Sequence, residues 1–256
     1  MSRREHISRS ETPPARRQWG GGEFNTTHWS VVLLAGQDGS LEAADALEKL
    51  CRTYWYPLYV YCRRQGYGPP DGEDLTQQFF SVFLAKSSFA VATPDRGRFR
   101  NFLLASFRHF LANEHHRNRT AKRGGKFSIV SWDEIEPEAR YQSEPMVGVT
   151  PEKLYEQTWA VTLLGKVAKD LQSEYVASGK GRIFDALHVY LTGDKADLTY
   201  EEIGATLQMG ESAVKMAVSR LRQRYGLMLR HEIAHTVTDP ASVEDELRHL
   251  VGVLSS

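Results

Sequence analysis

The stretch TYEEIGATLQMGESAVKMAVSRLR, residues 199–222, decides the fold of the C-terminal half of this chain. It opens with Thr199 and has Glu202 three residues later, which is the spacing of a capping box at a helix start. The pattern predicts a short helix, a turn of four or five residues beginning at Gln208, and a longer helix from Ala213. This order of elements is typical of a helix-turn-helix.

Helical periodicity also dominates the rest of the chain, whereas strand signals are scarce. Apolar residues recur at helical spacing over 41–64, where Pro57 is expected to kink or split the helix. Further apolar helices are predicted from Asp71 and over 99–116. Thr150 followed by proline is a helix-start signature, with the threonine as N-cap.

These helices fall into two predicted domains, so the expected fold class is all-α with two helical domains joined by a linker. Residues 27–123 and 151–237 would form the domains, because apolar periodicity is lost over 124–150. Residues 1–26 lack the apolar segment of a secretory signal and are interpreted as a flexible tail. Residues 238–256 are interpreted as a helical extension.

The composition of the 256 residues is that of an ordinary globular protein, with 41% apolar and 25% charged side chains. No apolar run reaches the roughly 18 residues that a membrane helix needs. The two cysteines, Cys51 and Cys62, would lie about 16 Å apart on one helix, which is too far for a disulfide. We therefore expect a cytoplasmic protein with two free thiols and no membrane partner.

A formal net charge of zero hides two basic blocks. Between Asp95 and Lys126 there are nine basic and two acidic residues, so 9 − 2 gives +7. Between Ser212 and Arg230 there are five basic residues and no acidic ones. Such blocks attract phosphate backbones through counterion release. Because the second block lies on the second helix of the helix-turn-helix, nucleic-acid binding is favoured over a merely solvated charged face.

Three motifs add to this picture: DGEDLTQQFF at 71–80, RFRNFLL at 98–104 running into RNR at 117–119, and LTYEEIG at 198–204 followed by AVK at 213–215 and SRLR at 219–222. In this order and at these separations they resemble a bacterial sigma factor of the extracytoplasmic-function type. The resemblance covers roughly residues 27–237 and is weakest in the linker.

The resemblance implies a non-enzymatic subunit that brings core RNA polymerase to selected promoters, with no cofactor and no metal. Polymerase would be contacted by Asp74, Gln77 and Phe80. Minus-ten DNA would be opened and read by Arg96, Arg98, Phe99, Arg100, Asn101, His109, Asn113, Arg117 and Arg119, with the loop from Arg96 to Arg100 capturing a flipped base. The minus-thirty-five element would be contacted by Lys215, Met216, Ser219, Arg220 and Arg222. Besides core polymerase and promoter DNA, an anti-sigma protein or another regulator is a candidate partner.

The chain departs from the family pattern at two positions. Gly210 stands where a serine usually caps the recognition helix, and glycine is a tolerable N-cap. His109 stands where the family often has asparagine, which bears on base preference.

Other function classes stay open. HEIAH at 231–235 matches the zinc-peptidase pattern of two histidines one helical turn apart with a glutamate base, although no third ligand follows at a family spacing. His109, Glu114, His115 and His116 form a second candidate metal cluster. A stand-alone helix-turn-helix regulator would explain the C-terminal half, but it would leave 71–80 and 98–119 without a role.

Overall fold

The computed structural model describes residues 41–85, 98–118, 137–143, 148–191, 199–237 and 239–255. Every element in these ranges is helical, so the all-α prediction is confirmed for them. The helices are α2 (Leu41–Arg64), α3 (Pro69–Ala85), α4 (Phe99–Asn118), α5 (Pro137–Ser143), α6 (Pro151–Ala177), α7 (Gly181–Leu187), α8 (Tyr200–Leu207), α9 (Glu211–Ala234) and α10 (Val243–Leu254), with 3₁₀ turns at His188–Tyr190 and Pro240–Ser242. Among the described helices, none combines the length and the hydropathy needed to cross a bilayer.

Local sequence signals account for several helix starts. Thr150 accepts a hydrogen bond from the Lys153 amide at 3.2 Å, and Pro151 occupies the first turn of α6, as predicted. Helix α3 begins at Pro69, two residues before the expected start at Asp71. A proline fits the first turn because its missing N–H has no intrahelical partner there.

Helix α2 is not split at Pro57, contrary to one of the two expected outcomes. A proline inside a helix costs about 3 kcal/mol through the lost hydrogen bond and the ring clash. That cost is offset by packing, because Tyr54, Leu58 and Tyr61 are all buried around it. Tertiary burial therefore overrides the local preference.

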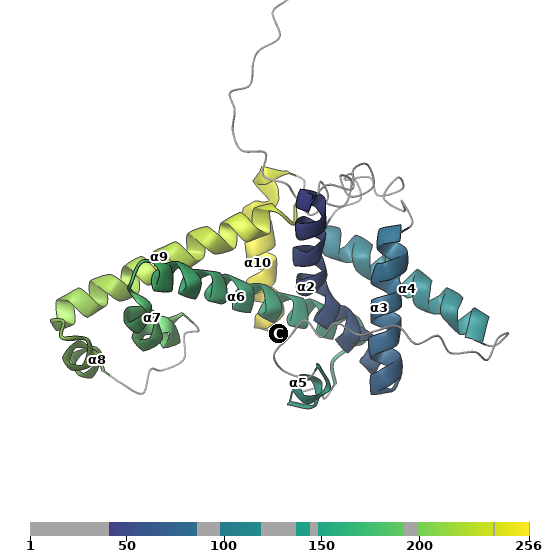
Figure 1. The fold of residues 1–256 in the computed structure, drawn as a ribbon, viewed down its shortest axis with the longest axis horizontal. Coiled ribbons are helices and arrows are strands. Elements are labelled where there is room, and N and C mark those ends of the chain that lie inside the picture. The colour runs from purple at the N-terminus through teal and green to yellow at the C-terminus, as the bar shows by residue number, and fades with distance from the viewer. Residues whose placement is uncertain are drawn as a thin grey trace, which may run out of the picture.

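The largest hydrophobic cluster, called the central core below, crosses the predicted domain boundary. It joins α2, α3 and α4 to the first half of α6, the end of α9 and α10. From the second predicted domain it takes Tyr155, Trp159, Ala160, Leu163 and Ile233, and from the extension Leu250 and Val253. In Figure 1, α10 stands in the middle of the molecule, while α6 and α9 run together toward α7 and α8. The described residues thus show one continuous core at the position of the predicted boundary.

Helix α5 lies inside the predicted linker and was not anticipated, because seven residues are too few to show a periodic pattern. It docks on α2 through Glu138, which accepts hydrogen bonds from Arg63 at 2.8 and 2.9 Å and from the Tyr59 hydroxyl at 2.6 Å. Burial raises the pKa of Glu138, but these hydrogen bonds outweigh it and hold the pKa below its ordinary value. Arg140 adds a cation–π contact, 3.8 Å from the centre of the Tyr56 ring.

Both cysteines are free thiols, as expected. Cys62 is fully buried and Cys51 is half-buried. Burial raises the pKa of each thiol to about 12. They therefore behave as small apolar residues of α2 at neutral pH.

Candidate nucleic-acid interface

The helix-turn-helix forms through the capping box that the sequence predicts. The Thr199 hydroxyl accepts a hydrogen bond from the Glu202 amide at 3.3 Å, and Glu202 accepts one from the Thr199 amide at 2.7 Å. These bonds hold the pKa of the exposed Glu202 carboxyl below its ordinary value, the backbone bond being the largest cause. Helix α8 consequently starts at Tyr200 and ends at Leu207, as predicted.

The turn is shorter than expected, because α9 begins at Glu211 rather than Ala213. Gly210 is its N-cap with extended backbone, so glycine does serve at the position where the family usually has serine. Gln208 ends α8 in the left-handed conformation with φ 56°. The Met209 amide then donates to the Gly204 carbonyl at 2.8 Å, which brings the turn against α8.

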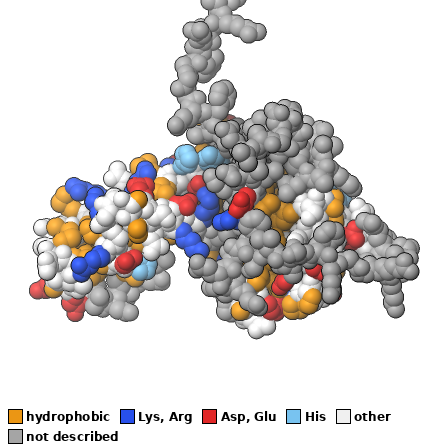
Figure 2. Space-filling model, in the orientation of Figure 1, with side chains coloured by type: hydrophobic (Ala, Val, Ile, Leu, Met, Phe, Trp, Pro, Cys, Tyr) orange, Lys and Arg blue, Asp and Glu red, His pale blue; other side chains and the backbone are white. Residues whose placement is uncertain are grey.

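A separate hydrophobic cluster, called the helix-turn-helix core below, holds α8 and α9 against α6 and α7. It contains Leu171, Phe184, Leu187, Tyr190, Ile203, Val214, Val218 and Leu221. Because Val214, Val218 and Leu221 point inward, the opposite face of α9 is presented to solvent. Lys215, Met216, Ser219, Arg220 and Arg222 are all exposed on α9, and Figure 2 shows basic side chains among apolar ones at this end of the molecule.

The predicted residues of α9 differ in how they are engaged. Arg222 donates from Nε to the Tyr190 carbonyl at 2.9 Å, so part of its guanidinium is bound to the protein itself. The Lys215 Nζ atom lies 2.6 Å from the Glu211 Oε1 atom. Exposed ion pairs of this kind contribute little to stability. Met216 is 56% exposed, which is unusual for an apolar side chain and places a flexible thioether on the same face.

The first basic block is only partly described. Arg96 and Arg119 lie outside the described residues, and for Arg117 only the helical backbone is described. On α4, Asn101, His109 and Asn113 are exposed, and the last two lie one helical turn apart. A small cavity of about 330 Å³ adjoins His109 and Arg108.

Phe99 and Arg100 do not lie in an exposed loop, where the resemblance placed them. They form the first turn of α4, and they are 0% and 1% exposed. Phe99 belongs to the central core, and the Arg100 guanidinium carbon lies 4.4 Å from the centre of the Trp159 ring. In the described arrangement neither side chain reaches solvent, because α6 and α10 pack over this turn.

The charge that balances this turn comes from the C-terminal helix. Glu246 of α10 is 1% exposed and forms ion pairs with Arg98, at 2.6 Å from its Nε, and with Arg100. Glu156 is a more distant partner, with its Oε1 atom 3.9 Å from the Arg100 Nε atom. Burial lowers the pKa of the Arg100 guanidinium, and the nearby positive charge of Arg98 adds to this shift.

The sequence contains a signal for Glu246 in the spacing of the α10 residues. Glu246, Leu250 and Val253 are the buried residues of α10, and their spacing puts them on one face. Val243, Leu247, Leu250 and Leu254 also recur at helical spacing in this segment, but Leu254 is 40% exposed. A carboxylate in register with a buried apolar face indicates a buried cationic partner.

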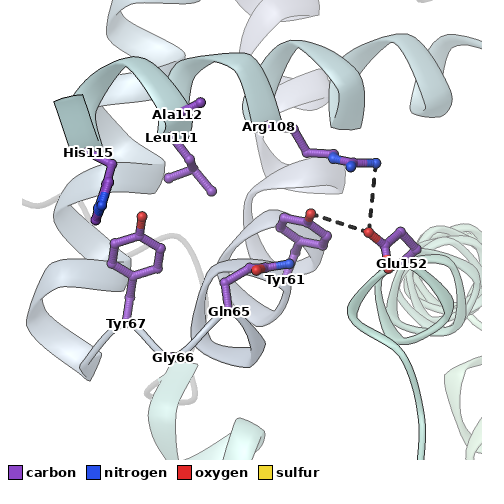
Figure 3. A pocket seen from close by; sticks show the side chains of 9 residues that line it. All are labelled: Tyr61, Gln65, Gly66, Tyr67, Arg108, Leu111, Ala112, His115 and Glu152. Carbon is purple, nitrogen blue, oxygen red and sulfur yellow. Dashed lines mark hydrogen bonds and ion pairs between the residues drawn. The ribbon is translucent and has the colours of Figure 1, made fainter.

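A larger cavity of about 580 Å³ opens between the end of α2, α4 and the start of α6. On one side of the cavity, Figure 3 shows Arg108 and Tyr61 pointing toward Glu152. The Arg108 Nη1 atom lies 3.8 Å from the Glu152 Oε1 atom, and the Tyr61 hydroxyl donates to the same oxygen at 3.5 Å. His115 and the Tyr67 ring lie on the other side. The lining is mixed in polarity and includes residues of the α4 basic block, so the cavity belongs to the same surface.

Helix α3 presents two of the three predicted polymerase-binding residues. Asp74 is exposed and Gln77, three residues later, is half-buried, so they share one outward face. Phe80 is 5% exposed and packs against Phe79, with ring centroids 5.5 Å apart. Phe80 is thus part of the central core rather than of an exposed contact surface.

The HEIAH segment lies at the end of α9. The rings of His231 and His235 approach to 4.6 Å between centroids, but Glu232 is paired with Lys166 at 2.6 Å. Among the described residues, no group of three or more histidine, cysteine, aspartate or glutamate side chains is arranged to hold a metal ion.

Compared with known protein families, with curated proteins and with solved structures, the chain finds no match in any of the three.

Proposed function

We propose that this chain is an RNA polymerase sigma factor of the extracytoplasmic-function type, which directs promoter recognition, DNA opening and transcription initiation. The observation that carries the proposal is the face of α9. Its buried residues are fixed in the helix-turn-helix core, while Lys215, Met216, Ser219 and Arg220 remain exposed on a helix that follows a tight turn. An exposed helix with this composition suits the major groove and its flanking phosphates.

A second contact surface is needed for a sigma factor, and α3 supplies it. Asp74 and Gln77 offer a carboxylate and an amide on one outward face, supported beneath by the buried Leu75 and Phe79. A short polar face on a rigid helix suits docking to another protein, because the helix backbone loses little conformational freedom on binding. In this proposal α3 holds core polymerase and α9 holds DNA, and polymerase performs the chemistry.

The first experiment is co-purification of the full chain with bacterial core RNA polymerase. The Asp74→Ala, Gln77→Ala double variant is expected to lose stoichiometric binding. A matched control is the Lys169→Ala, Ser173→Ala double variant, which changes two exposed residues of α6. Failure of the folded wild-type protein to bind core polymerase would contradict the proposal.

A stand-alone helix-turn-helix regulator is the second candidate, and one observation favours it. The face of α9 is exposed, whereas Phe99 and Arg100 of the minus-ten segment are buried. Duplex DNA binding by the chain alone, with a defined site and no effect of added core polymerase, would support the regulator. Binding that appears only in the presence of core polymerase would support the sigma factor.

A further inference from the structure

Helix α10 places one carboxylate where the rest of its face is apolar. Glu246 is 1% exposed and lies between the buried Leu250 and the arginines of the α4 start. Its neighbours Glu244 and Asp245 are exposed, as helix-surface acids usually are. A fully buried carboxylate in a surface helix needs a specific electrostatic reason.

That reason is the arginine pair, Arg98 and Arg100. Glu246 brings one oxygen to 2.6 Å from the Arg98 Nε, and its other oxygen pairs with Arg100. Arg100 is also stacked on Trp159 from the α6 side, so α6 and α10 enclose it from two directions. One side-chain carboxylate thus pairs with two arginines of the basic block to which the resemblance to sigma factors assigns DNA contact.

We propose that α10 is a displaceable occupant of a phosphate-binding surface, with Glu246 taking the place of a backbone phosphate of single-stranded DNA. This inference rests on the proposed function, since it concerns two arginines that a sigma factor would use to bind DNA. Carboxylates and phosphates present the same kind of acceptor oxygens to a guanidinium, so one can substitute for the other. Binding of DNA at this surface requires α10 to leave it.

The contact has the character of a reversible one. The Glu246 carboxylate and the Arg100 guanidinium are both removed from water, each at 1% exposure, with their charges paired. Pairing two buried charges often recovers the cost of their desolvation only in part. The other polar contacts of α10 with α6 are exchangeable for water: His249 to Glu156 at 3.0 Å, and Gln157 to the Val253 carbonyl at 3.4 Å.

The remaining face of α10 is compatible with release. Val251 is 60% exposed and Leu254 is 40% exposed, so only one side of this helix is sealed in the core. A DNA strand also offers several phosphates, whose counterions are released on binding, whereas α10 offers one buried carboxylate. Competition between the two is therefore expected to depend on the Glu246 charge.

The test uses the full chain and a fluorescein-labelled single-stranded oligonucleotide of mixed sequence. Glu246→Gln keeps the side-chain shape and removes the charge, so by linkage it is expected to tighten oligonucleotide binding by about fivefold or more. Asp245→Asn is the matched control, because it makes the same change in net charge at an exposed position whose ion pair, with Arg248, stays within α10. The control is expected to change the affinity by less than about twofold, which is the effect of net charge alone.

A second measurement needs no variant. Amide hydrogen exchange over 243–254 of the wild-type protein is expected to accelerate when the oligonucleotide is saturating, because α10 leaves its site. Unchanged protection over 243–254 in the bound protein would overturn the inference, as would equal affinities of Glu246→Gln and Asp245→Asn.

The two proposals fail in distinguishable ways. Retained polymerase binding with no effect of DNA on α10 would remove this inference and leave the sigma-factor proposal in place. Absence of both polymerase and DNA binding by the folded chain would remove the proposed function, and this inference with it.

Discussion

Gly204→Ala tests the geometry of the helix-turn-helix by the sign of its effect on stability. A Cβ atom at Gly204 would lie 2.6 Å from the Met209 carbonyl oxygen, whereas ordinary contacts begin at 3.4 Å. The turn must therefore move by 3.4 − 2.6 = 0.8 Å. The oxygen belongs to the backbone, so no change of side-chain rotamer can relieve the contact. The same turn is held by the hydrogen bond from the Met209 amide to the Gly204 carbonyl.

Two opposing effects set the magnitude. Overpacking of this kind costs about 1–3 kcal/mol, while alanine is favoured over glycine inside a helix by about 0.8–1.0 kcal/mol. Gly204→Ala is thus expected to lower the free energy of unfolding by about 1 kcal/mol, the middle of that difference. For a chain of this size the corresponding fall in Tm is about 2–4 °C.

Urea denaturation followed by circular dichroism measures this change, with Gly165→Ala as the matched control. Gly165 also lies inside a helix, but a Cβ there would meet nothing within 4 Å among the described residues. Its substitution is expected to raise the free energy of unfolding by about 0.5–1 kcal/mol. Equal stabilisation by both variants would refute the close approach of the turn to α8.

Three further predictions concern DNA binding, pH dependence and thiol reactivity. Arg220→Ala is expected to reduce the slope of log affinity against log salt for duplex DNA by about one, with Lys169→Ala as the control that leaves the slope unchanged. Because the pKa of Glu138 is depressed in the folded state, its stabilisation is present above the ordinary carboxyl pKa and is lost as the pH falls through the lowered value. The unfolding free energies of the wild type and Glu138→Gln should therefore converge in acid, and a constant difference from pH 7 to pH 3 would contradict the assignment. With pKa values of about 12, Cys51 and Cys62 should resist iodoacetamide in the native protein at pH 8 and react in urea, and mass spectrometry reads both states.

The features that the sequence alone determined are those set by neighbouring residues. The capping box of α8, the Thr150 cap and first-turn proline of α6, and the exposed face of α9 follow from spacing over one or two helical turns. Backbone hydrogen bonds and side-chain periodicity act over that range, so the order of residues suffices to predict them.

The tertiary structure decided what depends on contacts between distant segments. Phe80 and Phe99 were assigned to contact surfaces but lie in the central core, and α2 continues through Pro57 because its flanks are buried there. Arg100 lies on α4 and Glu246 on α10, far apart in the chain, yet they form one ion pair. Whether a charged side chain faces DNA or a carboxylate of its own chain depends on which helices pack around it, and the free energy of that packing is the sum of many long-range contacts that no local pattern contains.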